Sequence, residues 1–127
     1  MTFDVKTTVQ VNDIQFGMDR KEVRKLNKNR YNEFKKSIFS KNTTDDFRGF
    51  HVYYNTENKC EAVEIFDFDE IIINGKTVGK SVDDYKAVLS DLEYEDGGYI
   101  SKEASVGITE EDGQVAAILF GCAGYYD

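Results

Sequence analysis

An internal repeat limits the folds that are open to this chain of 127 residues. Residues 52–66 (VYYNTENKCEAVEIF) align with residues 106–120 (VGITEEDGQVAAILF), so that apolar positions and the polar turn coincide. A helix start precedes each of these segments. Because a recurring order of elements indicates a structural repeat, the sequence predicts two unequal copies of one unit, over approximately residues 14–68 and 76–122.

Each predicted unit begins with an amphipathic helix. Asp19 and Ser81 are placed to cap the two helices, and an acidic residue follows each of them by three positions, as in a capping box. In the first unit the polar residues 27–29 interrupt the helical pattern. Apolar side chains then continue at helical spacing and predict a second short helix that contains Tyr31, Phe34 and Ile38.

The remaining patterns predict β-structure. Residues 3–11 alternate between apolar and polar side chains, which is typical of a half-buried strand. Hairpin turns are predicted at residues 55–59, 74–75 and 112–113, the second of them an Asn-Gly pair. We therefore expect an α+β fold built from helix-plus-β-hairpin units, and a single domain over residues 1–127.

The start of the first helix carries a family resemblance. Its pattern resembles the repeat of β-lactamase-inhibitor-protein-like domains and of small outer-membrane assembly lipoproteins, through Gly17, Met18, Asp19, Glu22 and Val23. The resemblance implies tandem repeats whose helices pack on one face of an antiparallel sheet, while the other, concave face of the sheet binds a protein. The overall pattern, with its closing Gly-Tyr-Tyr-Asp, is also similar to small cytosolic proteins of Gram-positive bacteria.

The charge distribution favours a basic protein partner. The formal net charge is −8, but residues 1–41 hold ten Lys and Arg against five Asp and Glu, whereas residues 42–127 hold six against 19. An acidic majority repels phosphate, so no nucleic-acid partner is expected. The basic residues around the first helix are expected to form a solvated helix face, and these are Lys21, Arg24, Lys25, Lys28, Lys35 and Lys36.

The sequence also predicts a cytoplasmic protein that does not bind membranes. No apolar run approaches the roughly 20 residues that a membrane helix needs, and residues 1–6 lack the apolar block of a signal peptide. In a reducing compartment Cys60 and Cys122 are expected to be free and mostly buried thiols, with a redox or bridging pair as the alternative.

No pattern in the chain is typical of an enzyme or of a cofactor site. His51 is the only histidine, and a turn centred on residues 58–59 would place it opposite Phe66 rather than opposite Cys60. The acidic residues 64–70 lack the order of a calcium-binding loop. They are instead expected to protect a strand end against aggregation or to bind Lys and Arg of a partner. The sequence therefore predicts no catalytic residues, no bound metal and no cofactor.

Tyrosine and carboxylate side chains are the predicted contacts with a partner. Exposed tyrosine beside carboxylates is typical of binding hot spots, although tyrosine is also an ordinary half-buried strand residue. The residues predicted to bind a partner are Tyr53, Glu64, Asp67, Asp69, Glu70 and Tyr126.

Together these features favour a non-enzymatic protein-binding module, as a monomer or a homodimer. Within that class, the first expectation is a cytosolic immunity protein that neutralises a basic toxin domain, since an acidic surface would steer and shield a cationic partner. The alternative is a structural or regulatory module, for example one carried by a phage, that self-associates through its sheet.

Overall fold

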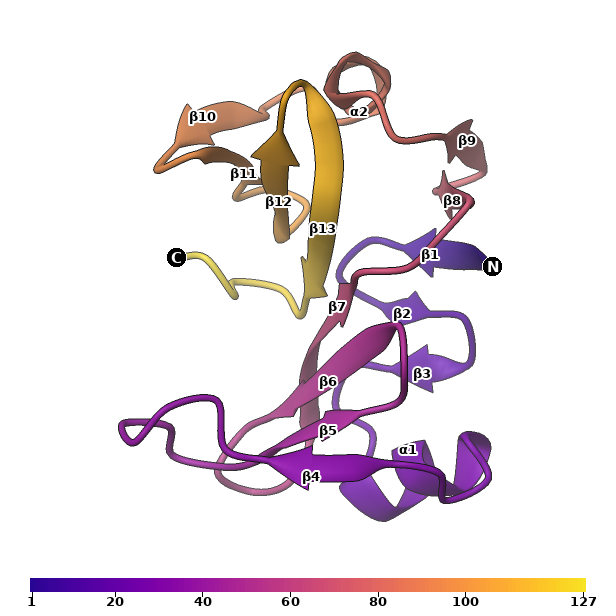
Figure 1. The fold of residues 1–127 in the computed structure, drawn as a ribbon, viewed down its shortest axis with the longest axis vertical. Coiled ribbons are helices and arrows are strands. Elements are labelled where there is room, and N and C mark those ends of the chain that lie inside the picture. The colour runs from indigo at the N-terminus through magenta and orange to yellow at the C-terminus, as the bar shows by residue number, and fades with distance from the viewer.

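The computed structural model describes residues 1–127 and is dominated by β-structure. About 46% of the residues lie in strands and 11% in helices, so the predicted α+β class is wrong. The two helices, α1 (Arg20–Leu26) and α2 (Val82–Val88), have seven residues each and lie at opposite ends of the molecule rather than forming a layer on a sheet (Figure 1). Both helices are too short to reach across a lipid bilayer.

The larger sheet has eight strands in the order β10-β11-β12-β13-β7-β6-β5-β4, and all neighbours in it are antiparallel. Its strands are β4 (Asn32–Phe34), β5 (Thr44–Asp46), β6 (Phe50–Tyr54), β7 (Cys60–Ile65), β10 (Glu93–Glu95), β11 (Gly98–Ser101), β12 (Val106–Glu111) and β13 (Gln114–Gly121).

The smaller sheet has five strands in the order β3-β2-β1-β8-β9. Its central pair, β1 and β8, is parallel, and its other pairs are antiparallel. The strands are β1 (Thr2–Lys6), β2 (Gln10–Val11), β3 (Ile14–Gln15), β8 (Glu70–Ile73) and β9 (Lys76–Val78).

One core holds the two sheets together. Phe3 and Ile71 of the smaller sheet and Ile65 and Phe120 of the larger one belong to a single cluster of 23 buried residues. Contact between the sheets is direct, because the rings of Phe3 and Phe50 meet edge to face with centroids 5.7 Å apart. Only one face of the eight-stranded sheet is therefore covered by the smaller sheet.

The order of elements recurs along the chain. A hairpin, a short helix and a four-stranded antiparallel meander occur over residues 2–65 and again over residues 70–121, with β3 as an addition in the first half. The two meanders meet at β7 and β13, where Ile65 lies opposite Ile118. Each half supplies four of the eight strands, and the hairpins that precede the helices join side by side in the smaller sheet.

The local turn signals are confirmed. Asn74 and Gly75 connect β8 to β9, and Asp112 and Gly113 connect β12 to β13, all four with the positive φ that such turns require. The helix starts at Asp19 and Ser81 are also confirmed, but neither side chain makes a capping hydrogen bond. Asp19 instead lies 3.5 Å from the ammonium group of Lys59.

Three longer-range expectations are wrong. Residues 3–11 are not one strand, because Thr8 turns with a φ of 62° and divides them into β1 and β2. The second short helix is absent: α1 ends where Lys28 and Asn29 adopt positive φ, and Phe34 then lies in β4. The third error concerns the pairing of β6 with β7. His51 lies opposite Glu64 rather than Phe66, and the register shifts between Tyr53 and Tyr54.

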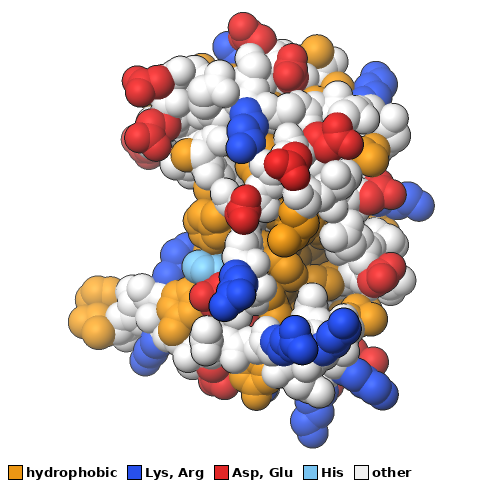
Figure 2. Space-filling view, turned by 45° about the vertical axis from the view of Figure 1, so that its right-hand side comes forward, with side chains coloured by type: hydrophobic (Ala, Val, Ile, Leu, Met, Phe, Trp, Pro, Cys, Tyr) orange, Lys and Arg blue, Asp and Glu red, His pale blue; other side chains and the backbone are white.

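Charge is segregated along the molecule. Figure 2 shows Lys and Arg side chains gathered at the end that holds α1, whereas Asp and Glu side chains are spread over the opposite end. The loop of residues 35–43 between β4 and β5 projects to one side (Figure 1). Its tip is apolar, because the side chains of Ile38 and Phe39 are 83% and 86% exposed.

Candidate functional site

The eight-stranded sheet has an outer face that points away from the core. His51 lies opposite Glu64, and Glu64 lies opposite Leu119 in the next strand. Because directly opposed residues point to the same side of a sheet, these three side chains share the outer face. Tyr53 and Ala62 form the neighbouring pair, and together with Leu119 they make a small buried cluster separate from the main core.

The C-terminal segment, residues 122–127, packs on this outer face. Tyr125 and Tyr126 contact the small apolar cluster, and their rings meet edge to face. A Cβ atom added to Gly121 would lie 2.6 Å from the Cγ of Tyr125, and one added to Gly107 would lie 2.8 Å from the Cζ of Tyr126. The two glycines therefore provide the space in which the tyrosine rings lie.

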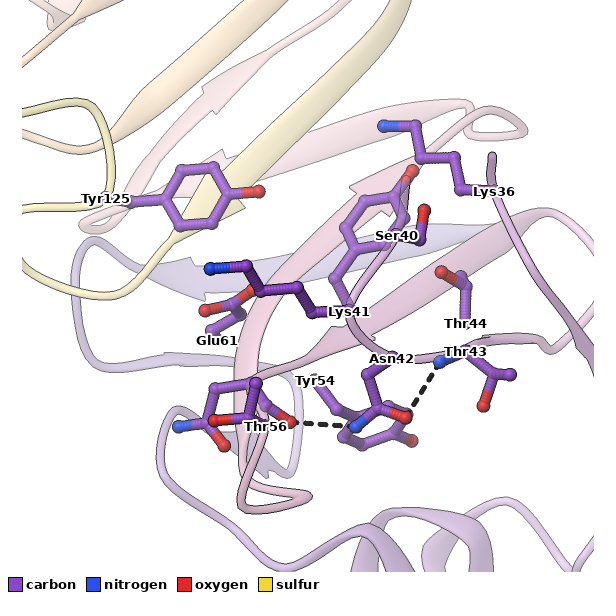
Figure 3. A pocket seen from close by; sticks show the side chains of 12 residues that line it. Lys36, Ser40, Lys41, Asn42, Thr43, Thr44, Tyr54, Thr56, Glu61 and Tyr125 are labelled. Atoms are coloured by element: carbon purple, nitrogen blue, oxygen red, sulfur yellow. Dashed lines mark hydrogen bonds between the residues drawn. The ribbon is translucent and has the colours of Figure 1, made fainter. Parts of the chain in front are cut away.

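Two neighbouring cavities open on the outer face, with volumes of about 400 Å³ and 370 Å³. Lys36 and Tyr125 line both of them, so we treat the pair as one groove with two chambers. Figure 3 shows the first chamber, into which Lys36, Lys41 and Tyr125 point. Hydroxyl and amide groups make up most of its remaining wall.

The second chamber is acidic. Glu64, Glu95 and Asp96 line it, against the single cation of Lys36. Glu95 and Asp96 come from the end of β10 and the turn that follows, whereas Glu64 comes from β7 in the other half of the chain. The chamber is thus assembled from both halves and favours a positively charged ligand.

Tyr53, Glu64 and Lys36 form a compact arrangement where the two chambers meet. The hydroxyl of Tyr53 donates a hydrogen bond to Oε1 of Glu64, and the ammonium nitrogen of Lys36 lies 4.6 Å from the centre of the Tyr53 ring. Burial and the hydrogen bond to Glu64 raise the pKa of Tyr53 above its ordinary value. The phenol therefore stays a proton donor over the physiological pH range.

The structure brings together three of the six residues predicted to bind a partner. Tyr53, Glu64 and Tyr126 all belong to the outer face, and Glu64 and Tyr126 line the same chamber. Tyr53 is only 8% exposed, because Lys36 and the C-terminal segment cover it. The predicted strand tyrosine is consequently a mostly buried floor residue of the groove.

The other three predicted residues lie elsewhere. Asp67 and Asp69 are in the connection between β7 and β8, and Glu70 is the first residue of β8, opposite Thr2 in the smaller sheet. Asp69 accepts a hydrogen bond from the N-terminal ammonium group, which lowers the pKa of this carboxyl. The acidic sequence cluster is therefore divided, and only Glu64 faces the groove.

Not all of the basic residues near α1 form a solvated face. Arg24 turns inward and binds the fully buried Asp45 through two hydrogen bonds of 2.8 Å and 2.9 Å. Tyr54 donates a hydrogen bond to the same carboxylate, and Arg20 lies 3.4 Å from it. Burial alone would raise the pKa of Asp45, but these hydrogen bonds outweigh it and hold the pKa below its usual value.

The histidine and the cysteines show no arrangement for catalysis. His51 packs between Phe34 and Phe66 on the outer face, whereas Cys60 is buried in the core on the other side of the sheet. Burial raises the pKa of the Cys60 thiol to about 12, which keeps it protonated and unreactive. No three His, Cys, Asp or Glu side chains are grouped as ligands for a metal ion.

Sequence reasoning missed four features of the groove. The sequence pattern predicts Lys36 on a solvated helix face, and the roles of Tyr125, Glu95 and Asp96 depend on the folding of distant segments. One signal was present in the sequence, because Gly107 and Gly121 interrupt strand patterns that end near two adjacent tyrosines. A comparison with protein-family models, curated proteins and solved structures found no match to this chain.

Proposed function

We propose that this chain is a non-enzymatic cytosolic protein that binds a basic segment of another protein in the groove of its outer sheet face, and that it neutralises a cationic toxin domain in this way. The observation that carries the proposal is the acidic chamber, which three carboxylates line together with a single lysine, and one of these carboxylates, Glu64, is held by a hydrogen bond from Tyr53. Tyrosine rings beside carboxylates suit Lys and Arg side chains, which combine an apolar stem with a charged head.

The net charge of the chain supports the same kind of partner. A formal charge of −8 attracts a cationic protein over a distance and raises the rate of association at low ionic strength. The projecting tip of Ile38 and Phe39 adds exposed apolar surface beside the groove. A partner that contacted both would bury these apolar side chains and pair its cations with the carboxylates, as in the core and rim of typical interfaces.

Self-association through the sheet is the second candidate function. The strands β4 and β10 are free edges of the eight-stranded sheet, and free edges can pair with a strand of another chain. Two glutamates of β10, Glu93 and Glu95, are exposed and would repel a second copy of the same edge. Charge repulsion at β10 therefore ranks pairing through this edge below the groove.

The proposal is tested by co-expression with cationic protein domains encoded next to the gene of this chain, followed by calorimetry on the purified pair. We expect the triple variant Glu64→Gln, Glu95→Gln and Asp96→Asn to weaken binding at least tenfold, about 1.4 kcal/mol. The matched control is Asp67→Asn, Asp69→Asn and Glu70→Gln, which changes the net charge equally outside the groove. Equal losses in both triple variants, or no loss in the first, would contradict the assignment of the site.

A further inference from the structure

The geometry points to a subsite for one guanidinium or ammonium group of the partner, which Lys36 of the chain itself occupies in the free protein. This inference rests on the proposed function and adds the residue class that the groove recognises. The subsite consists of the Tyr53 ring and the Glu64 carboxylate, and Lys36 is its internal occupant.

The carboxylate of Glu64 can accept further hydrogen bonds. Its Oε1 atom accepts the hydrogen bond from Tyr53, whereas no protein group donates a hydrogen bond to Oε2 and no cation lies within ion-pair distance. An ionised carboxylate accepts hydrogen bonds at both oxygens. The Tyr53 hydroxyl fixes the orientation of the group, so that the free oxygen is available to a donor that enters the groove.

The Tyr53 ring offers the second half of a cation site. Lys36 lies 4.6 Å from the ring centre, within the range in which a cation is attracted by an aromatic face. An arginine side chain fits the same place better than a lysine does, because its planar guanidinium can stack on the ring while its N–H groups reach a carboxylate. The subsite thus favours arginine over lysine.

The internal occupant is held weakly. Lys36 belongs to the loop of residues 35–43, and the hydrogen bonds of residues 35–41 are confined to Ser37, Phe39 and Ser40. No hydrogen bond ties this stretch to the body of the protein. A cation–π contact at an exposed site changes a binding constant by only about 2- to 5-fold, so an incoming cation can displace Lys36 without breaking other structure.

The same displacement places the loop tip against the partner. Ile38 and Phe39 follow Lys36 by two and three residues and are almost fully exposed. When the Lys36 side chain leaves the Tyr53 ring, the loop is free to move together with its apolar tip. The partner can then cover Ile38 and Phe39. Exchange of the internal cation and burial of the tip would then occur together.

An NMR titration of the full-length protein with the tripeptide acetyl-Gly-Arg-Gly-amide tests the subsite. We expect the largest amide shift changes at Tyr53, Glu64 and Leu119. The variant Lys36→Met removes the internal cation and keeps the length of the side chain, and it should bind the peptide about 2- to 5-fold more tightly, which corresponds to the loss of a weak cation–π contact. Glu64→Gln should weaken binding about tenfold.

Two controls separate this result from a general effect of charge. Lys35→Met makes the same change of net charge one residue away and should alter affinity less than twofold. Glu111→Gln, at an exposed position near the β12–β13 turn, is the matched control for Glu64→Gln. Equal tightening in Lys36→Met and Lys35→Met, shifts centred away from Tyr53, or no peptide binding to any variant would overturn the inference.

The outcome for the subsite is distinguishable from the outcome for the proposed function. If the peptide binds as expected but no cationic domain forms a complex, the subsite stands and the toxin-neutralising role fails. If a complex forms but Lys36→Met and Lys35→Met bind the partner equally, the function stands and the exchange of the internal cation is wrong.

Discussion

The two halves of this molecule build the same order of elements with different chemistry. In the first half, α1 is attached to the sheet by a buried ion cluster, in which Asp45 binds Arg24 and Tyr54. In the second half, α2 is attached by the buried side chains of Val82 and Tyr85, and the Tyr85 hydroxyl donates one hydrogen bond to the Gly79 carbonyl. The architecture therefore does not depend on a buried charge, and the ion cluster is a feature of one half alone.

This difference predicts that the halves respond unequally to the loss of one polar group. Asp45→Ala would leave the buried guanidinium of Arg20 and the partly buried one of Arg24 without the carboxylate that they share, and we expect a loss of about 3–5 kcal/mol in the free energy of unfolding. Tyr85→Phe removes one hydrogen bond and should cost about 1 kcal/mol. Urea denaturation measures both. Similar losses in the two variants would show that the ion cluster is no more important than the single hydrogen bond.

A second prediction compares the two glycines under the C-terminal tyrosines. In Gly121→Ala the new methyl group would meet the Cβ and Cγ atoms of Tyr125, which are fixed close to the backbone, so we expect a loss of about 1–3 kcal/mol. In Gly107→Ala the collision is with the far end of Tyr126, which can swing aside at a smaller cost. The loss in Gly107→Ala should disappear when Tyr126 is also changed to Ala, as a double-mutant cycle by denaturation would show.

The ion cluster and the outer face are expected to limit the stability of the protein at opposite ends of the pH scale. The pKa of Asp45 is lowered on folding, so its contribution is present above its unfolded pKa of about 4 and is lost as the pH falls below that value. Asp45→Asn should therefore flatten the decline of stability in acid. The measurement is the urea midpoint between pH 5 and pH 2, and an unchanged slope in the variant would contradict the assignment.

Burial raises the pKa of Tyr125 and of Tyr126 to about 12. The pKa shift on folding therefore has the opposite sign to that of Asp45, and the pH dependence of stability on the outer face is reversed. A group whose folded pKa is raised stabilises the protein fully below its unfolded pKa, about 10 for tyrosine, and this contribution is lost as the pH rises towards 12. The double variant Tyr125→Phe and Tyr126→Phe should remain stable to a higher pH, as absorbance at 295 nm and circular dichroism during an alkaline titration would show.

The smallest expected effect concerns the loop tip. Ile38→Ser and Phe39→Ser remove apolar side chains that contact little in the free protein, so the free energy of unfolding should change by no more than about 0.5 kcal/mol. Binding of a cationic partner should nevertheless weaken. A large loss of stability would show that the tip packs on the protein rather than on a partner.

Local signals were sufficient for part of this fold. The pairs Asn74-Gly75 and Asp112-Gly113 determine their turns because both residues accept a positive φ, and that property does not depend on the rest of the chain. Helix spacing at Tyr31, Phe34 and Ile38 was misleading, because pairing with β5 converts residues 32–34 into a strand. Such pairing depends on residues at least ten positions away and is not encoded in a short apolar pattern.

The candidate site was even less accessible to sequence reasoning. Tyr53 and Glu64 are both predicted from the sequence as partner contacts, and the pairing of β6 with β7 places both on the outer face. The contribution of Lys36 depends on how an irregular loop lies over β6, and that of Tyr126 depends on the return of the chain end over Gly107. Asp67 and Asp69 are close to Glu64 in the sequence, but β7 ends at Ile65 and both residues lie in the connection that follows it. Proximity along the chain therefore does not place them on the outer face.

Hydrogen–deuterium exchange on the complex with a cationic partner is the most direct test of the groove. We predict added protection in residues 35–41, in β6 and β7, in the turn at residues 95–98 and in the C-terminal segment 122–127, with little change in β8 and β9. Protection confined to the smaller sheet, or to the free edges β4 and β10, would contradict the account that the outer face of the eight-stranded sheet is the binding surface.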